Sequence, residues 1–128
     1  MSGPARAGVF IYAKNVQRLA HFYQSLLGMT RAHVTPDLMV LNSADLQITV
    51  HAMPPHLAAQ VEISSPPQRR DGAAYKFFFT VPSLADAAAL AASLDGELLA
   101  EQWRGPGFVV HNVIDPEGNI FQLRERVA

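Results

Sequence analysis

Two segments of this chain share nearly the same pattern at a constant separation. Each has a short apolar run, then a helix-capping residue, a helical pattern and a glycine. The capping residues are Asn15 and Ser83, the glycines are Gly28 and Gly96, and 83 minus 15 and 96 minus 28 both give 68. Glycine readily adopts the left-handed conformation that ends a helix. An internal repeat constrains the whole fold, because each copy must build the same unit of structure.

The first copy begins with the apolar and aromatic run from Val9 to Ala13, which is short enough to be a buried strand. Asn15 can accept hydrogen bonds from the first amides of a helix. Apolar residues then recur at helical spacing on one face, namely Val16, Leu19, Phe22, Tyr23, Leu26 and Leu27. Three strands are expected next, near residues 29–34, 38–42 and 46–51. Their short connections predict antiparallel neighbours.

The second copy repeats the scheme with a strand at residues 74–81. Ser83 and Asp86 have the spacing of a capping box for a helix rich in alanine. The expected buried stripe of that helix consists of Leu84, Ala87, Ala88, Leu90, Ala91 and Leu94. Strands are expected near residues 98–103, 108–114 and 120–124. The last two are joined by Asp115 to Asn119, whose proline and glycine predict a tight hairpin turn.

The segment between the copies differs in composition from both. Residues 52–72 contain two pairs of adjacent prolines and end in Arg69-Arg70-Asp71-Gly72. We interpret the segment as a tether, with a brief ordered piece at residues 61–63; the alternative is a lid, a common role for long connections in compact domains. The chain is therefore expected to be one domain over residues 1–128, with modules at about 8–51 and 73–124.

Composition excludes several classes of protein. The formal net charge is −1 and there is no basic tract, which argues against binding to nucleic acid or to an anionic membrane. The chain has no cysteine, so disulfides, thiolate metal sites and cysteine nucleophiles are excluded. No apolar run approaches the ~20 residues of a spanning helix, and the first residues do not resemble a signal peptide. Charged residues make up only 16%, which favours a partner subunit over part of the surface. We expect a cytoplasmic protein.

Two motifs carry a resemblance to a known family. The first is the strand and helix from Val9 to Gly28, and the second is the turn and strand from Asp115 to Leu123. Gln47 and Gln122 also lie between apolar neighbours in both copies. Over residues 8–124 the chain resembles the vicinal oxygen chelate superfamily, which includes glyoxalase I, bleomycin resistance proteins and extradiol dioxygenases. The resemblance implies an α+β fold in which two βαβββ repeats form an open U-shaped sheet around a cleft, and a homodimer.

Enzymes of this superfamily hold a divalent metal ion on one ligand from each of four strands. The resemblance places these four positions on Gly8, Gln47, Lys76 and Gln122. Glycine has no side chain, lysine adds a positive charge, and glutamine amides are weak ligands for transition metals. The resemblance therefore implies a protein with this fold and with no metal cofactor. His51 and His111 are the alternative metal pair, although their spacing fits no local ligand motif.

Strand alternation extends these positions to a face of mixed aromatic and polar character. The ligand-binding candidates are Phe10, Tyr12, Gln47, Thr49, His51, Lys76, Phe78, Trp103, Gln122 and Arg124. This combination suits a planar organic ligand. Two alternatives remain open: Phe10 and Phe78 could fill the core, and Lys76 could extend into solvent.

The leading functional hypothesis is a protein that binds a small organic molecule, such as an antibiotic, and sequesters or senses it. Affinity would come from stacking and apolar burial, with Lys76 and the two glutamines fixing the orientation. No catalytic residue is assigned. The alternative is a lyase, isomerase or dioxygenase that depends on a metal ion or on Lys76. A third possibility is a regulatory protein whose own side chains fill the cleft.

Overall fold

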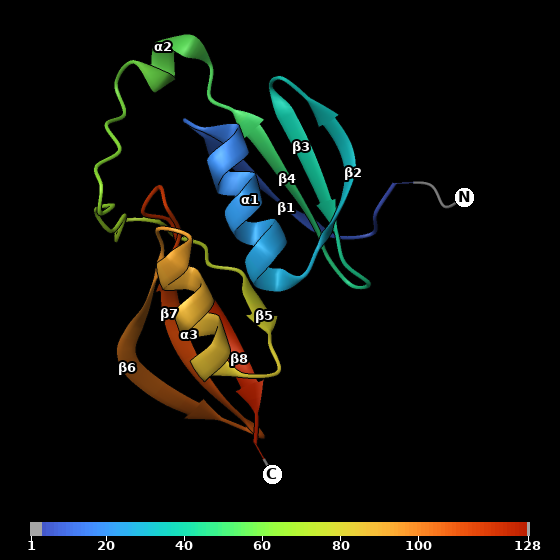
Figure 1. The fold of residues 1–128 in the computed structure, drawn as a ribbon, viewed down its shortest axis with the longest axis vertical. Helices are drawn as coiled ribbons and strands as arrows, with labels where there is room; N and C mark the ends of the chain where they lie inside the picture. The colour runs from blue at the N-terminus through green and yellow to red at the C-terminus, as the bar shows by residue number, and fades with distance from the viewer. Residues whose placement is uncertain (1–3, 128) are drawn as a thin grey trace. The chain divides into compact units, whose positions relative to one another are not determined.

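The computed structural model describes residues 4–127 and has an α+β fold built from two βαβββ repeats. Each repeat forms its own open four-stranded sheet with one helix on it (Figure 1). The chain divides into two compact units, Met1–Glu62 and Ile63–Ala128, and the boundary falls inside the expected tether. Among the described residues, no helix has the length and apolar character needed to cross a membrane.

The first unit has the expected order of elements. They are β1 (Gly8–Ala13), α1 (Val16–Leu27), β2 (Thr30–Thr35), β3 (Leu38–Asn42) and β4 (Gln47–Ala52). The strand order in the sheet is β1-β4-β3-β2. The β2–β3 and β3–β4 pairs are antiparallel as predicted, and the helix between β1 and the rest of the unit allows β1 to run parallel to β4.

Local sequence explains where α1 begins and ends. The side chain of Asn15 accepts a hydrogen bond of 3.1 Å from the backbone N–H of Arg18, and Gly28 ends the helix with φ 63°. All six apolar residues predicted for the buried stripe are buried. The helix contacts β1, β3 and β4, and the strand residues that are fully buried are Ala13, Met39, Leu41, Ile48 and Val50. This packing leaves the opposite sheet face uncovered by α1.

The segment between the repeats contains a short helix, α2 (Pro55–Ala58). The ordered piece expected at residues 61–63 is neither helix nor strand. The ammonium group of Lys14 donates a hydrogen bond to the carbonyl of Val61, which attaches this part of the segment to the first unit.

The second unit contains the same elements in the same order. They are β5 (Phe78–Thr80), α3 (Leu84–Ser93), β6 (Glu97–Gly105), β7 (Phe108–Ile114) and β8 (Ile120–Arg126). The strand order is β5-β8-β7-β6, with β5 parallel to β8 and the other pairs antiparallel. The repeat predicted from the sequence is therefore confirmed at the level of topology.

Three details of the second repeat differ from the prediction. The strand expected at residues 74–81 is reduced to β5, because only Phe78–Thr80 pair with β8. The left-handed residue after α3 is Asp95, with φ 68°, and not Gly96. Leu90 is exposed, since it lies at the edge of a buried stripe formed by Leu84, Ala87 and Ala91.

The start of α3 has two caps. The hydroxyl of Ser83 accepts a hydrogen bond of 3.1 Å from the N–H of Asp86, as the capping box predicts. A carboxylate oxygen of Glu125, on the neighbouring strand β8, accepts a second bond of 2.6 Å from the N–H of Leu84. This second cap comes from 41 residues away along the chain, so local sequence could not reveal it.

The predicted hairpin turn between β7 and β8 is organised by Asp115, which is fully buried. One of its carboxylate oxygens accepts hydrogen bonds from the N–H groups of Glu117 and Asn119, at 2.8 and 3.0 Å. Gly118 has φ 86°, and a side chain there would collide with the carbonyl oxygen of Gln68. The N–H of Arg70 donates to the carbonyl of Gly118 at 2.9 Å, so the turn holds the end of the preceding segment.

Candidate functional site

In each unit, the predicted site residues lie mainly on the sheet face that is not covered by the helix. Register in the first unit pairs Gly8 with Gln47, Phe10 with Thr49 and Tyr12 with His51. Paired residues point to the same side of a sheet. We call this surface, defined by Gly8, Phe10, Tyr12, Gln47, Thr49 and His51, the β1–β4 face.

Three rings form a cluster on the β1–β4 face. The rings of Phe10 and His51 are stacked, with centroids 5.7 Å apart and an interplanar angle of 24°. Tyr12 meets both rings edge-on, at 5.1 Å from Phe10 and 6.0 Å from His51. Phe10 and Tyr12 remain 55% and 53% exposed, so neither ring belongs to a buried core. The cluster is an aromatic surface held in place by its own edge and stacking contacts.

An amide pair lies at one end of this face. The amide nitrogen of Gln47 donates a 2.9 Å hydrogen bond to the side-chain oxygen of Asn42 on β3. Gly8 has a structural reason to be glycine, because a Cβ atom there would lie 2.6 Å from the backbone oxygen of Gln47. The amide pair also lines an open pocket of about 590 Å³ between residues 4–7 and residues 42–47.

The second unit presents the corresponding β5–β8 face, defined by Phe78, Trp103, Phe108, Asn112, Gln122 and Arg124. Its centre is Arg124, whose guanidinium carbon lies 3.7 Å from the centroid of the Phe78 ring and 4.2 Å from that of Phe108. Phe78 comes from β5 and Phe108 from β7, the two strands that flank β8. Gly105 leaves room for the Phe108 ring, since a Cβ atom at position 105 would collide with it.

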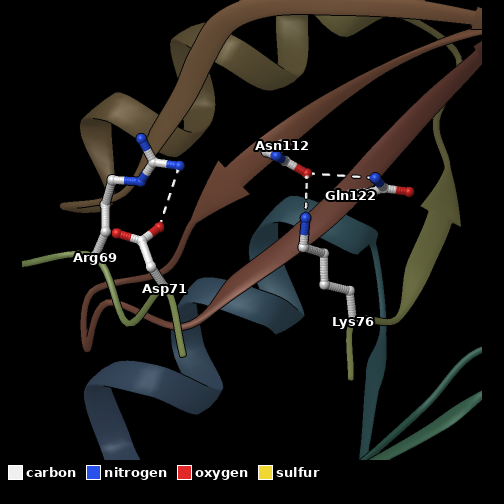
Figure 2. A network of polar contacts seen from close by, with 5 residues as sticks. All are labelled: Arg69, Asp71, Lys76, Asn112 and Gln122. Carbon is white, nitrogen blue, oxygen red and sulfur yellow. Dashed lines mark hydrogen bonds and ion pairs between the residues drawn. The ribbon is translucent and has the colours of Figure 1, made fainter. Parts of the chain in front are cut away.

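A second amide pair lies next to Arg124. The side-chain oxygen of Asn112 accepts two hydrogen bonds of 3.3 Å, one from the amide nitrogen of Gln122 and one from the ammonium group of Lys76 (Figure 2). Arg69 and Asp71, also drawn in Figure 2, form a separate and largely exposed ion pair of 3.4 Å. Lys76 therefore contacts the amide pair and not a carboxylate.

The sequence predicted that Lys76 occupies the position equivalent to Gly8, and the strand register shows that this prediction is wrong. Gly8 pairs with Gln47, and the residue paired with Gln122 is Phe78. The two strand positions differ by 78 minus 8, or 70, whereas the helix caps differ by 68. The second repeat has two fewer residues than the first between the strand position that pairs with glutamine and the helix cap. The spacing between the two caps therefore does not predict the spacing between the two strand positions. The lysine side chain still reaches the amide pair because it is long.

Sequence reasoning missed Asn42, Asn112 and Phe108. The two asparagines are equivalent in both repeats, since each pairs across its sheet with the corresponding glutamine, and 112 minus 42 again gives 70. Asn42 follows the apolar run from Leu38 to Leu41, which was the signal available for it, whereas His111 precedes Asn112 and interrupts the corresponding run. Phe108 had a weaker signal, its position directly after Gly105-Pro106-Gly107.

The two histidines considered as an alternative metal pair lie in different units, on faces that are not equivalent in the two repeats. His51 belongs to the β1–β4 face, whereas His111 pairs with the fully buried Leu123 and so lies on the other side of its sheet from Gln122. The ring nitrogens of His111 lie 2.7 Å from the carbonyl oxygen of Leu99 and 3.1 Å from the side-chain oxygen of Gln102. Its contacts therefore lie along β6.

Trp103 lies within β6, at the end of the strand expected near residues 98–103. It pairs with Val110, which in turn pairs with Arg124, so the indole is on the β5–β8 face. Its side chain is 41% exposed. Because β6 is the last strand of its sheet, Trp103 marks the outer side of this face.

The four positions implied as metal ligands do not form a suitable donor set. They supply no side chain at Gly8, two neutral amides already bonded to asparagines, and one ammonium group. Divalent transition metals favour imidazole, carboxylate or thiolate ligands. Across residues 4–127, no three or more side chains of histidine, cysteine, aspartate or glutamate come together where they could hold a metal ion.

Comparisons with known proteins agree with this architecture. A glyoxalase/bleomycin resistance protein/dioxygenase family enzyme from Burkholderia phytofirmans PsJN has 18% identity and a TM-score of 0.72, with 97% of this chain and 100% of that chain covered. The fosfomycin resistance protein FosX from Listeria monocytogenes has 15% identity, a TM-score of 0.67, and coverage of 99% and 95%. A bleomycin resistance determinant encoded on the transposon Tn5 has 17% identity, a TM-score of 0.63, and coverage of 98% and 100%.

These likenesses to solved structures, all at low identity, concern the fold. A comparison with curated protein sequences finds no significant match. The glyoxalase-like domain family matches residues 8–124, almost the whole chain. That match includes both sheets, both helices that cover them and the turn organised by Asp115. The chain therefore belongs to the glyoxalase-like family, within the vicinal oxygen chelate superfamily.

Proposed function

We propose that this protein binds a small organic molecule without a metal ion, and that it sequesters or senses that molecule. The observation that carries the proposal is the exposure of ordered aromatic rings beside amide pairs on both candidate faces. Phe10, Tyr12 and Phe78 are each more than half exposed, yet each contacts a neighbouring ring or guanidinium group. Exposed apolar surface next to placed polar groups is typical of ligand-binding sites.

The chemistry of these faces suits binding more than catalysis. A ligand ring stacked on Phe10 or Phe78 would gain about 0.5–1.5 kcal/mol for each aromatic contact beyond the burial of apolar area. The rings are already fixed by their neighbours, so little side-chain entropy would be lost on binding. The amide pairs offer donors and acceptors without a charge, and they would fix the orientation of the ligand.

Two relatives support an antibiotic as one class of ligand. Their names connect them with resistance to fosfomycin and to bleomycin. The low share of charged residues, 16%, supports the further proposal of a homodimer, and the absence of cysteine is compatible with the cytoplasmic location that we also propose. Ligand binding and oligomeric state are separate parts of this proposal, and each has its own measurement.

The binding proposal is tested by a thermal-shift panel that includes bleomycin, fosfomycin and neutral, anionic and cationic planar aromatic compounds. A stabilising compound would then be measured by titration calorimetry against wild type, Phe10→Ala, Phe78→Ala and Tyr75→Ala. Tyr75 is the matched aromatic control because it is 91% exposed and lies outside both faces. We expect either Phe10→Ala or Phe78→Ala to weaken binding about tenfold, and Tyr75→Ala to have no effect. A panel without any stabilising compound would overturn the proposal.

The proposal that binding requires no metal ion has a separate test. Protein purified without chelators and then dialysed would be measured for metals by plasma mass spectrometry, and ligand affinity would be compared with and without EDTA. We expect less than one metal ion per chain and equal affinities. Stoichiometric metal together with EDTA-sensitive binding would show that another donor set is present. Sedimentation analysis would test the homodimer.

A further inference from the structure

The β5–β8 face carries positive charge that no acidic side chain neutralises. Arg124 is at its centre, and the ammonium group of Lys76 lies beside Asn112 at its edge. Among the described residues, no carboxylate forms an ion pair with either cation. Gln122 and Arg124 are two residues apart on one side of β8, and Asn112 bonds both Lys76 and Gln122, so the two cations lie on the same face.

The environment of Arg124 decides which of its donors are available. Rings from two flanking strands contact the guanidinium group, so its orientation is fixed by cation–π contacts. The Nε atom is shielded from solvent and has no hydrogen-bond partner. The terminal Nη groups are therefore the donors left for a ligand. A pair of parallel N–H bonds from these groups matches the two oxygens of a carboxylate.

The surroundings also select the shape of the ligand. Phe78 is 54% exposed, and Trp103 lies in the same cross-strand row as Arg124. A flat ring could lie on Phe78 while its acidic group meets the Nη groups. Asn112 and Gln122 lie between the two cations and would contact polar substituents of the same ligand.

We infer that the β5–β8 face binds a planar aromatic carboxylate, with Arg124 as the anion anchor and Lys76 as a second cationic contact. This inference rests on the proposed function and specifies its ligand class. The β1–β4 face as defined above contains no lysine or arginine, and Thr49 occupies the position that matches Arg124, so the anion would be recognised in the second unit.

The test uses 2-naphthoate and its neutral analogue 2-naphthamide as probes, measured by titration calorimetry with the full chain. Hydrogen bonds to a charged group predict that wild type binds naphthoate about tenfold more tightly than naphthamide. Arg124→Gln should remove most of this difference, with the smaller contribution of Lys76 remaining, and should leave naphthamide binding unchanged. Raising the salt concentration should weaken naphthoate binding only.

Two further variants separate a charge effect from a structural one. Arg104→Gln makes the same change of charge on β6, but Arg104 pairs with Val109 and so lies on the other side of the sheet from Trp103. It should bind naphthoate like wild type. Lys76→Gln changes an exposed side chain, is expected to fold normally, and should weaken naphthoate binding about threefold while sparing naphthamide.

The outcomes distinguish this inference from the proposed function. Equal affinity for the two probes, with both weakened by Phe78→Ala, would overturn the carboxylate class and leave small-molecule binding in place. Equal effects of Arg104→Gln and Arg124→Gln would show a nonspecific charge effect and also overturn it. If Arg124→Gln does not fold, the Lys76→Gln comparison and the salt dependence decide the question.

Discussion

The two repeats carry the same amide pair in different chemical surroundings. In the first, Asn42 and Gln47 adjoin a glycine and a cluster of neutral rings. In the second, Asn112 and Gln122 adjoin two cations, and the rings serve as contacts for Arg124. The comparison teaches that the amide pair belongs to the shared framework of the sheet, whereas its neighbours determine what each face can bind.

The largest expected effect concerns the two glycines that make room on these faces. Gly8→Ala would push a Cβ atom against a backbone oxygen and should lower the free energy of unfolding by about 2 kcal/mol. Gly105→Ala would meet only the Phe108 ring, which can rotate away, and should cost below about 1 kcal/mol. Urea denaturation measures both. Equal losses would mean that the crowding at Gly8 is relieved in solution.

The next prediction compares the two asparagines. Asn112 is buried and accepts two side-chain hydrogen bonds, whereas Asn42 is half-buried and accepts one from Gln47. Asn112→Ala should therefore cost about 2 kcal/mol and Asn42→Ala about 1 kcal/mol, because the half-buried glutamine donors lose their acceptors and Asn112 loses two bonds at a buried position. The same denaturation experiment applies. A greater loss for Asn42→Ala would reverse our ranking of the two amide pairs.

Helix caps provide a smaller effect. Asn15→Ala should destabilise the protein by about 1 kcal/mol, the usual value for a lost N-cap. Ser83→Ala should cost only about 0.5 kcal/mol, because Glu125 still accepts a hydrogen bond from the first turn of α3. The double substitution of Ser83 and Glu125 by alanine would restore the full loss if the second cap is responsible. Thermal unfolding followed by circular dichroism measures these differences.

The smallest expected effect is that of Lys76→Gln on stability. Lys76 is an exposed residue whose ammonium group donates a single hydrogen bond of 3.3 Å to Asn112, so the free energy of unfolding should change by less than about 0.5 kcal/mol. Calorimetric unfolding measures the change. A large loss would show that the lysine supports the fold of the β5–β8 face, and its role in binding would then need a different variant.

Periodicity and capping residues predicted most of the fold. The stripe of α1, its cap at Asn15 and its end at Gly28 were all correct, because each depends on residues within a few positions of one another. The length of β5 was wrong, since it depends on how far β8 extends beside it. Strand pairing of this kind is tertiary information that a single local pattern does not contain.

The candidate site was only partly predictable for the same reason. Alternation correctly placed Phe10, Tyr12 and His51 together on one face. It did not reveal that Asn112 links Lys76 to Gln122, or that Phe108 reaches Arg124, because both contacts cross between strands. Equivalent strand positions are 70 residues apart and the helix caps 68. Applying the cap spacing to the strands therefore assigned Lys76 to the position that Phe78 occupies opposite Gln122.

The contact between Gly118 and the preceding segment has a practical consequence for dissecting the molecule. Because the N–H of Arg70 bonds to Gly118 and Gln68 lies against it, residues 68–70 belong to the second unit. A fragment meant to fold as that unit should start at Ile63. A fragment that starts at residue 73 would lack the hydrogen bond from Arg70 and the contact with Gln68 at the hairpin turn. It should therefore unfold more readily.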